Sequence, residues 1–189
     1  SRSFGNLTVV DKVSFQISSG QVTCLLGPSG CGKSTTLRMI AGVETPSSGQ
    51  IFVEEKLIGS TTFQVPPEAR SIGLMFQDFA LFPHLNVQQN VYFGLSGPKD
   101  FKQKRSFDLL KKVGLAHLAF NYPHSLSGGE QQRVALIRAL APQPKIMLMD
   151  EPFSGLDDRL RDEIRDETFN LLRSEDTAVL MVTHDPQEA

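Results

Sequence analysis

The stretch Gly27-Pro28-Ser29-Gly30-Cys31-Gly32-Lys33-Ser34 determines the fold class of this 189-residue sequence. It matches the pattern G-x-x-x-x-G-K-[ST], and it lies between an apolar run at residues 22–26 and a helical pattern at residues 34–41. A glycine-rich loop between a strand and a helix is typical of phosphate binding, because its backbone N–H groups can surround phosphate oxygens and the helix start adds positive charge. We expect Lys33 to reach the β- and γ-phosphates and Ser34 to bind Mg²⁺.

The predicted phosphate-binding set comprises all eight residues of this loop and Thr35, which follows it. Cys31 occupies an unconstrained position of the motif, so we interpret it as a loop residue and not as a redox centre. Cys24 lies within the preceding apolar run and is interpreted as a small core side chain. Two cysteines cannot form a disulfide framework, which favours a reducing cytosol.

Four short apolar runs without polar alternation recur along the chain, at residues 22–26, 72–76, 146–149 and 178–182. Such runs are typical of strands buried on both faces, as in a parallel sheet covered by helices. Helical patterns are found between them, at residues 34–41, before Gly114, at residues 130–141 and at residues 158–173. Strands alternating with helices predict an α/β domain.

Two regions depart from that alternation. Residues 1–21 and 49–53 resemble shorter, partly polar strands and predict a small antiparallel sheet at the N-terminal edge, whereas residues 78–124 predict a helical insertion. We therefore expect one domain over residues 1–189, with a core at 1–77 and 125–189 and a helical part at about 78–124. The sequence ends just after Asp185-Pro186, which looks like a helix start, so we expect a fragment of a longer polypeptide.

The charge balance and the apolar runs argue against two classes of protein. With 19 Lys and Arg against 21 Asp and Glu, the net charge is −2, whereas nucleic-acid-binding proteins usually carry clustered positive charge. The longest apolar run, residues 178–182, is far shorter than the roughly 20 residues of a membrane helix. We therefore expect neither a nucleic-acid partner nor a membrane span.

Two acidic residues, Asp150 and Glu151, end the apolar run that begins at Ile146. Ligands of open parallel sheets bind beyond the carboxyl ends of the strands, so these acids should face the phosphate loop. There Asp150 can hold Mg²⁺, and Glu151 can take the proton of an attacking water. A plain strand-end turn explains the pair equally well by itself, but the phosphate loop favours phosphoryl transfer.

A second helix start follows at Leu126-Ser127-Gly128-Gly129-Glu130-Gln131. Ser127 is a natural N-cap, Glu130 completes a capping box, and the two glycines let the backbone approach an anion. The simplest interpretation is a well-capped helix. The alternative is a composite site, in which this helix start serves a nucleotide held by another copy of the chain.

Six segments together resemble a known family: residues 27–34, Gln77, residues 126–131, residues 146–151, residues 154–157 and His184. In this order they are similar to the Walker A, Q-loop, signature, Walker B, D-loop and H-loop motifs of the ATP-binding subunits of ABC transporters. The resemblance extends over essentially all 189 residues. It implies an α/β P-loop NTPase (RecA-like) core with a parallel sheet, an N-terminal antiparallel β-subdomain and a helical insertion.

The resemblance also implies an ATPase that uses Mg²⁺ and closes as a head-to-tail homodimer on ATP. Ser127 and Gly129, with Gly128 and Glu130 beside them, would then contact the partner's ATP. Gln77 would sense Mg²⁺ and water while coupling to a membrane permease, and His184 would contact the γ-phosphate. The implied catalytic residues are Glu151, His184, Gln77 and Lys33, and the implied metal ligands are Ser34, Gln77 and Asp150.

Two further assignments rest on the resemblance alone: Asp157 would reach across the dimer, and Phe4 would stack on adenine.

The branch of the family is indicated by residues 76–85, 90–91 and 150–154, which look like those of ATPases of bacterial importers for ferric iron, polyamines, sulfate or sugars. Ferric iron is our first expectation for the substrate and polyamine the second. Such a subunit would be peripheral on the cytoplasmic face of the bacterial inner membrane and would act indirectly with a substrate-binding protein.

Phe79, Leu81 and Phe82 form an apolar cluster close to Gln77. We interpret this cluster either as core packing or as a groove for a permease helix.

The alternative function is that of a soluble ABC-type ATPase of translation or DNA repair. Only 48 residues separate Gln77 from Leu126, which is too few for the long coiled coil of the repair members.

Overall fold

The computed structural model describes residues 1–154, 158–175 and 177–189. Its centre is a four-stranded parallel sheet with the order β3 (Val22–Leu26), β8 (Ala178–Thr183), β7 (Ile146–Asp150) and β6 (Ile72–Met75). The register pairs Leu26 with Thr183 and Asp150 with Val182, so the carboxyl ends of these strands lie at one edge. All four predicted core strands are therefore present and parallel.

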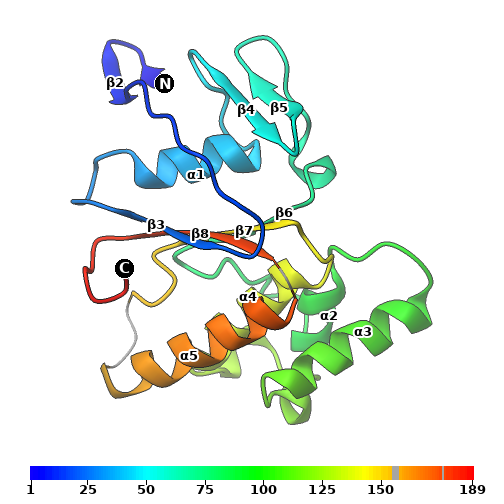
Figure 1. Cartoon of the computed structure of the whole chain (residues 1–189). Helices are drawn as coiled ribbons and strands as arrows, with labels where there is room; N and C mark the ends of the chain where they lie inside the picture. Colours follow the sequence, from blue (N-terminus) through cyan, green and yellow to red (C-terminus); the bar gives the residue numbers. More distant parts are fainter. Residues whose placement is uncertain (155–157, 176) are drawn as a thin grey trace.

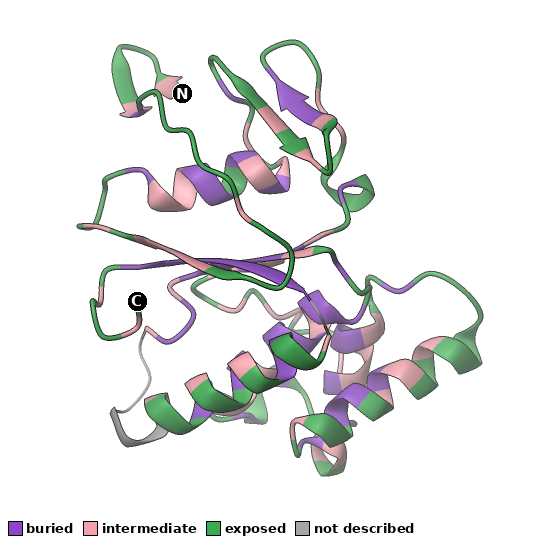
Figure 2. Ribbon diagram, in the orientation of Figure 1, coloured by how far each residue is buried: buried purple, intermediate pink, exposed green. Residues whose placement is uncertain are grey.

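The two faces of this sheet are covered by different helices (Figure 1). Because successive strand side chains point to opposite faces, Leu148 packs with Leu37 of α1 (Lys33–Ala41) on one side. Met147 and Met149 belong instead to the larger core on the other side, with α4 (Gly128–Leu140) and α5 (Asp158–Ser174). Figure 2 shows the central strands buried between these layers.

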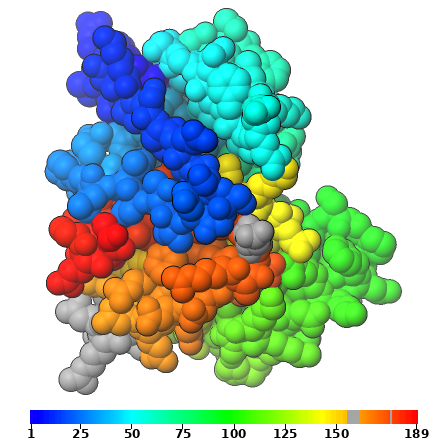
Figure 3. All heavy atoms as spheres, viewed as in Figure 1, coloured from blue at the N-terminus to red at the C-terminus, as the bar shows by residue number. Residues whose placement is uncertain are grey.

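The segment between β6 and β7 is helical wherever it is regular. It contains α2 (Val87–Tyr92), α3 (Lys99–Lys112), the 3₁₀ turns Ala116–Leu118 and Pro123–Ser125, and then α4. Another 3₁₀ turn, Pro67–Ala69, precedes β6. Figure 3 shows this helical part on one side of the molecule and the N-terminal hairpins on another. Within the described part of the chain, every helix is too short or too polar to span a bilayer.

The antiparallel part consists of two separate pairs, β1 (Arg2–Phe4) with β2 (Leu7–Val10) and β4 (Gln50–Val53) with β5 (Lys56–Ser60). The predicted α/β class with an antiparallel N-terminal part is confirmed, but one continuous small sheet was expected. Residues 11–21 form no strand in the described structure. The apolar side chains of Val13 and Phe15 remain 52% and 43% exposed there.

Candidate functional site

The phosphate loop, residues 27–32, connects β3 to α1 as the sequence predicts. Gly32 is the N-cap of α1 in the left-handed conformation, with φ at +92°, and a Cβ there would lie 2.4 Å from the Val9 carbonyl oxygen. Only glycine fits this position. No side chain caps α1, and the first-turn N–H groups of a helix have no intrahelical acceptors. The start of α1 therefore presents open donors to an anion.

Lys33 folds back over the loop that precedes it. Its ammonium donates hydrogen bonds to the carbonyl oxygens of Gly27 at 2.7 Å and Pro28 at 2.9 Å. Cys31 is exposed, and its Sγ lies 3.9 Å from the same ammonium. The remaining loop residues Pro28, Ser29 and Gly30 are exposed as well. The loop thus carries an accessible positive charge beside its open N–H groups.

Ser34 and Asp150 come together at the carboxyl edge of the sheet, where the acids were expected to face the phosphate loop. The Ser34 hydroxyl donates to Oδ1 of Asp150 at 2.7 Å. Burial raises the pKa of the Asp150 carboxyl, while the hydrogen bond from Ser34 and the charges of Arg38 and Lys33 act in the opposite direction. The side chain of Thr35, next to Ser34, is half-buried in the first turn of α1.

The Ser34–Asp150 pair fits a magnesium ion by its chemistry, because both side chains offer hard oxygen ligands. Among the described residues, no group of three or more His, Cys, Asp or Glu side chains forms a metal site. Mg²⁺ usually binds through one or two protein oxygens together with substrate phosphates and water, so this small set is sufficient.

Glu151 lies at the centre of a second cluster at the same sheet edge. Its Oε1 is 3.2 Å from Nδ1 of His184, and its Oε2 is 3.4 Å from Nε2 of Gln77. These three residues follow the ends of β7, β8 and β6, respectively. Neighbouring parallel strands therefore assemble a carboxylate, an imidazole and an amide that lie far apart in sequence.

The backbone of Glu151 is held in an uncommon conformation, with φ at +47°. Its N–H donates to the Val182 carbonyl at 2.9 Å, and its own carbonyl accepts from the Ser154 hydroxyl at 2.8 Å. Left-handed backbone at a residue other than glycine persists only where the surroundings enforce it, and such residues cluster at functional sites. Sequence reasoning missed this role of Ser154, for which only its place in the turn after the acidic pair offered a signal.

The second helix start is capped by its own side chains. The Ser127 hydroxyl accepts from the Glu130 N–H, and the Glu130 carboxylate accepts from the Ser127 N–H at 2.7 Å. These hydrogen bonds from Ser127 lower the pKa of Glu130. Gly128 has open space around it, whereas a Cβ at Gly129 would lie 2.8 Å from Ile164 of α5. Within the described structure, no hydrogen bond or ion pair joins this cap to the phosphate loop.

Two predicted site residues lie outside these clusters. Phe4 is at the end of β1 and 45% exposed, with the Arg2 guanidinium 4.4 Å above its ring. The hairpin that carries it approaches the phosphate loop through Val9 and Gly32. Asp157 lies outside the described residues, so its predicted role across a dimer stays a prediction.

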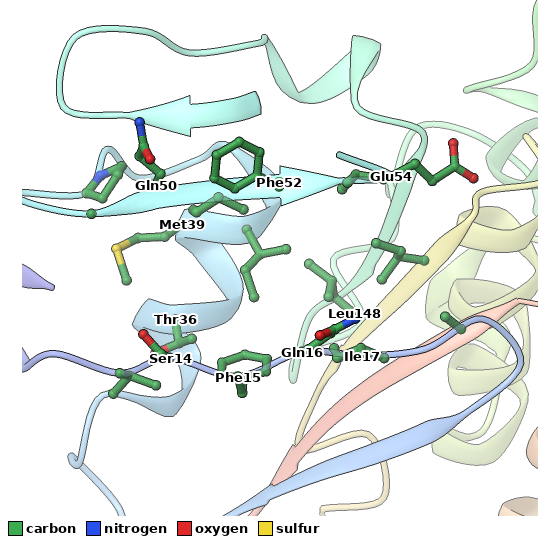
Figure 4. Close-up of a pocket in the computed structure, with 18 of the residues that line it drawn as sticks. Ser14, Phe15, Gln16, Ile17, Thr36, Met39, Gln50, Phe52, Glu54 and Leu148 are labelled. Atoms are coloured by element: carbon green, nitrogen blue, oxygen red, sulfur yellow. The ribbon is translucent and has the colours of Figure 1, made fainter. Parts of the chain in front are cut away.

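A cavity of about 860 Å³ is separate from both clusters. It lies between the segment at residues 13–19, helix α1 and strand β4, as Figure 4 shows for Phe15, Met39 and Phe52. Lys33, Ser34, Asp150 and Glu151 do not line it. Its volume therefore contributes nothing to the phosphate site.

The fold and the site together define a P-loop NTPase: a parallel sheet, a glycine-rich loop entering a helix, and acids at the carboxyl end of a neighbouring strand. The sequence model described as ABC transporter matches residues 10–154. The chain belongs to the ABC transporter family, which confirms the resemblance found in the sequence.

Three known proteins illustrate the similarity. The Fe(3+) ions import ATP-binding protein FbpC 2 of Haemophilus influenzae is 45% identical, over 98% of this chain and 53% of the relative. The putrescine transport ATP-binding protein PotG of Escherichia coli K12 is 47% identical, over 100% of this chain and 50% of the relative. The chain thus spans about half the length of these curated relatives. The ATP-binding cassette MJ0796, solved as a post-hydrolysis dimer bound to ADP and Pi, superposes with a TM-score of 0.82 at 32% identity, covering 96% of this chain and 82% of that one.

Proposed function

We propose that this chain is the ATP-hydrolysing part of a bacterial ABC importer. The observation that carries the proposal is the meeting of two clusters at one sheet edge, Ser34 with Asp150 and Glu151 with His184 and Gln77. The first has the chemistry to hold a magnesium nucleotide, and the second can activate water beside it.

Nucleotide binding follows from the open donors of the loop. Backbone N–H groups of residues 27–34 would surround the β- and γ-phosphates, and the Lys33 ammonium would exchange a loop carbonyl for a phosphate oxygen. Ser34 and Asp150 would hold Mg²⁺, which would supply positive charge to stabilise the phosphoryl oxygens. Phe4 would cover the adenine from the adjacent hairpin.

Hydrolysis requires a base aligned with the γ-phosphate. Glu151 would accept a proton from the attacking water, whose oxygen bonds to the γ-phosphorus as the bond to the ADP oxygen breaks. His184 and Gln77 are in contact with the two carboxylate oxygens of Glu151, so they would hold it in one orientation.

The second helix start would serve a second copy of the chain. Ser127, Gly128, Gly129 and Glu130 lie at the exposed start of α4 and make no described contact with the loop of their own chain. A head-to-tail homodimer would place them, with Asp157, against the partner's ATP. The dimeric structure of the MJ0796 cassette supports the association of two such chains.

The transport partners and substrate rest on the relatives. Matches to ferric-iron and putrescine import proteins support a peripheral subunit on the cytoplasmic face of the inner membrane, bound to permease subunits. A substrate-binding protein would act with it indirectly. Ferric iron is the first candidate substrate and polyamine the second.

The catalytic assignment is tested by Glu151→Gln in the full-length protein. We expect ATP binding to persist and turnover to fall by about 10²- to 10⁴-fold, as for loss of a general base. Steady-state phosphate release and equilibrium ATP binding measure the two effects. Near-normal turnover in this variant would remove Glu151 from the catalytic role.

The partner assignment is tested by purifying the same variant with ATP from native membranes. We expect a polytopic membrane protein to co-purify and to be identified by mass spectrometry, and its operon or binding protein would then indicate the substrate. Recovery of ribosomes or repair factors without a membrane protein would contradict the transport function and support a soluble ATPase.

A further inference from the structure

Arg138, near the end of helix α4, holds the turn that follows Gln77. Its guanidinium donates to the Ala80 carbonyl at 2.6 Å and to the Phe79 carbonyl at 2.9 Å. Burial lowers the pKa of Arg138, and the nearby charge of Asp78 opposes that effect; an arginine nonetheless stays protonated in proteins. The acceptors are main-chain carbonyls, so this contact fixes backbone geometry directly.

The turn held by Arg138 is strained. Phe79 and Ala80 are consecutive residues with left-handed backbone, at φ of +59° and +45°. Two such residues in succession are unfavourable for L-amino acids and persist only where neighbouring groups enforce them. The forked guanidinium, which binds both carbonyls, is such a constraint.

A second anchor fixes the next part of the same loop. The Arg138 guanidinium lies 5.3 Å from the centre of the Phe82 ring, a cation–π distance. The fully buried Asn90 of α2 accepts from the Phe82 N–H at 2.8 Å and donates to the Phe82 carbonyl at 3.1 Å. The loop is thus held by Asn90 on α2 and by Arg138 on α4.

These contacts connect helix α4, whose start is proposed to serve the partner's nucleotide, with the loop that follows Gln77. Arg138 lies ten residues after Gly128 on one helix, about 15 Å along its axis. The intervening Val134, Leu136 and Ile137 are buried, which favours movement of α4 as a rigid unit. Phe79 is two residues from Gln77, whose amide lies beside Glu151.

We propose that Arg138 is a positioning residue that links the start of α4 at Ser127 to the placement of Gln77 beside Glu151. The inference rests on the proposed ATPase function and adds a residue that sequence motifs do not mark. Movement of α4, when its start engages the partner's nucleotide, is transmitted through Arg138 to the Phe79–Ala80 turn. Gln77 then holds or releases Glu151, so each ATP site depends on the helix that serves the other.

Arginine is required for this role because of its shape. Its planar fork can donate to both carbonyls and stack on Phe82 at once, whereas lysine is a flexible point charge. Arg138→Lys therefore keeps the charge but loses the paired geometry. Arg133→Lys is the matched control, because Arg133 lies on the same helix and instead contacts Glu167 of α5 at 3.4 Å.

The experiment is a double-mutant cycle on ATP turnover by the full-length protein, with Arg138→Lys, Gln77→Ala and their combination. We expect Arg138→Lys to lower kcat about tenfold with little change in KM, because loss of one charged hydrogen bond to the loop would leave Gln77 less often in place beside Glu151. In the Gln77→Ala background the same change should have an effect under about twofold, because Gln77 is no longer there to be positioned. Arg133→Lys should leave kcat unaltered.

Each other outcome overturns the inference. An equal decrease in both backgrounds would show that Arg138 acts independently of Gln77, and a kcat unaffected by Arg138→Lys would show that the fork is dispensable. An Arg138→Lys protein that fails to fold, judged by thermal unfolding, would assign Arg138 to stability alone. Absence of turnover in the wild type would instead contradict the proposed function itself.

Discussion

The starts of α1 and α4 are both glycine-rich, but they satisfy their backbone donors in different ways. At α1 the N-cap is Gly32, and no side chain caps the first turn. At α4 Ser127 and Glu130 form a reciprocal capping box. The first start therefore leaves its donors for an external anion, whereas the second already has acceptors of its own.

This difference shows why similar helix starts can have different roles. The α1 start is surrounded by elements of its own chain, with Lys33 folded over the loop and Asp150 bonded to Ser34. The α4 start is stable without a ligand and lies at an exposed position. We infer that the first binds nucleotide within one chain and that the second exchanges its cap for the phosphate of a partner's nucleotide.

The largest expected difference between the two helix starts is in ATP affinity, when the positive charge of Lys33 at the α1 start is removed. Lys33→Ala should weaken ATP binding by about 100-fold, since hydrogen bonds to charged groups contribute up to about 3 kcal/mol. Lys145→Ala is the control, because that exposed lysine pairs with Glu54 outside both clusters. Fluorescent-nucleotide titration measures the affinities. Retention of wild-type affinity in the Lys33 variant would refute the phosphate-loop assignment.

Alanine substitutions of one glycine at each helix start, Gly32 at the N-cap of α1 and Gly128 at the first position of α4, should have different effects on stability. Gly32→Ala should lower the free energy of unfolding by at least about 2 kcal/mol, because left-handed backbone and the close Val9 carbonyl both oppose a Cβ. Gly128 has no neighbour within 4 Å, so Gly128→Ala should change stability by about 1 kcal/mol or less, in the favourable direction. Urea denaturation of both proteins makes the comparison; equal effects would contradict it.

Alanine substitutions of Ser127 and Ser34 should separate the effect of helix capping from the effect of nucleotide binding. Ser127→Ala removes the N-cap, so we expect the free energy of unfolding to fall by about 1 kcal/mol, with ATP affinity of the single chain preserved. Ser34→Ala removes the donor to Asp150 and a magnesium ligand, and there ATP affinity in Mg²⁺ should fall about tenfold. If Ser127→Ala lowered the ATP affinity of the single chain and Ser34→Ala did not, the nucleotide site would have to be assigned to the start of α4.

The smallest effects concern pH, and here the two regions have opposite signs. Burial raises the pKa of Asp150, so its contribution to stability is present below the pKa of an unfolded aspartate, about 3.9, and is lost as pH rises through the folded value. Hydrogen bonds from Ser127 lower the pKa of Glu130, so its contribution is present above about pH 4.3 and is lost as pH falls through the folded value.

Replacing each carboxylate by the corresponding amide tests these opposite pH dependences, when the free energy of unfolding is measured at a series of pH values. At neutral pH, Asp150→Asn should stabilise the chain and Glu130→Gln should destabilise it, and both differences should diminish on acidification. The Glu130 effect should also weaken with salt, because that side chain is partly exposed. Effects of the same sign at the two sites would contradict the comparison.

Local patterns were sufficient for much of the fold. The apolar runs predicted the four parallel strands, and the loop motif predicted the β3–α1 connection. The segment at residues 11–21 was predicted wrongly as strand, because a short, partly polar run is compatible with a strand but does not show whether a partner strand is present. Capping of α4 was predictable because Ser127 and Glu130 are three residues apart.

The sequence by itself determined the chemistry available to this protein: a phosphate loop at Gly27 to Ser34, acids at a strand end, and a capped glycine-rich helix start. The place of the acids at a strand end also predicted that they face the phosphate loop, but only the tertiary structure decided which side chains are in contact. Asp150 joins Ser34 across 116 positions, Gln77 joins Glu151 across 74, and Arg138 joins Phe79 across 59. Such contacts depend on strand order and helix packing, which burial of the whole core selects, and no local pattern encodes them.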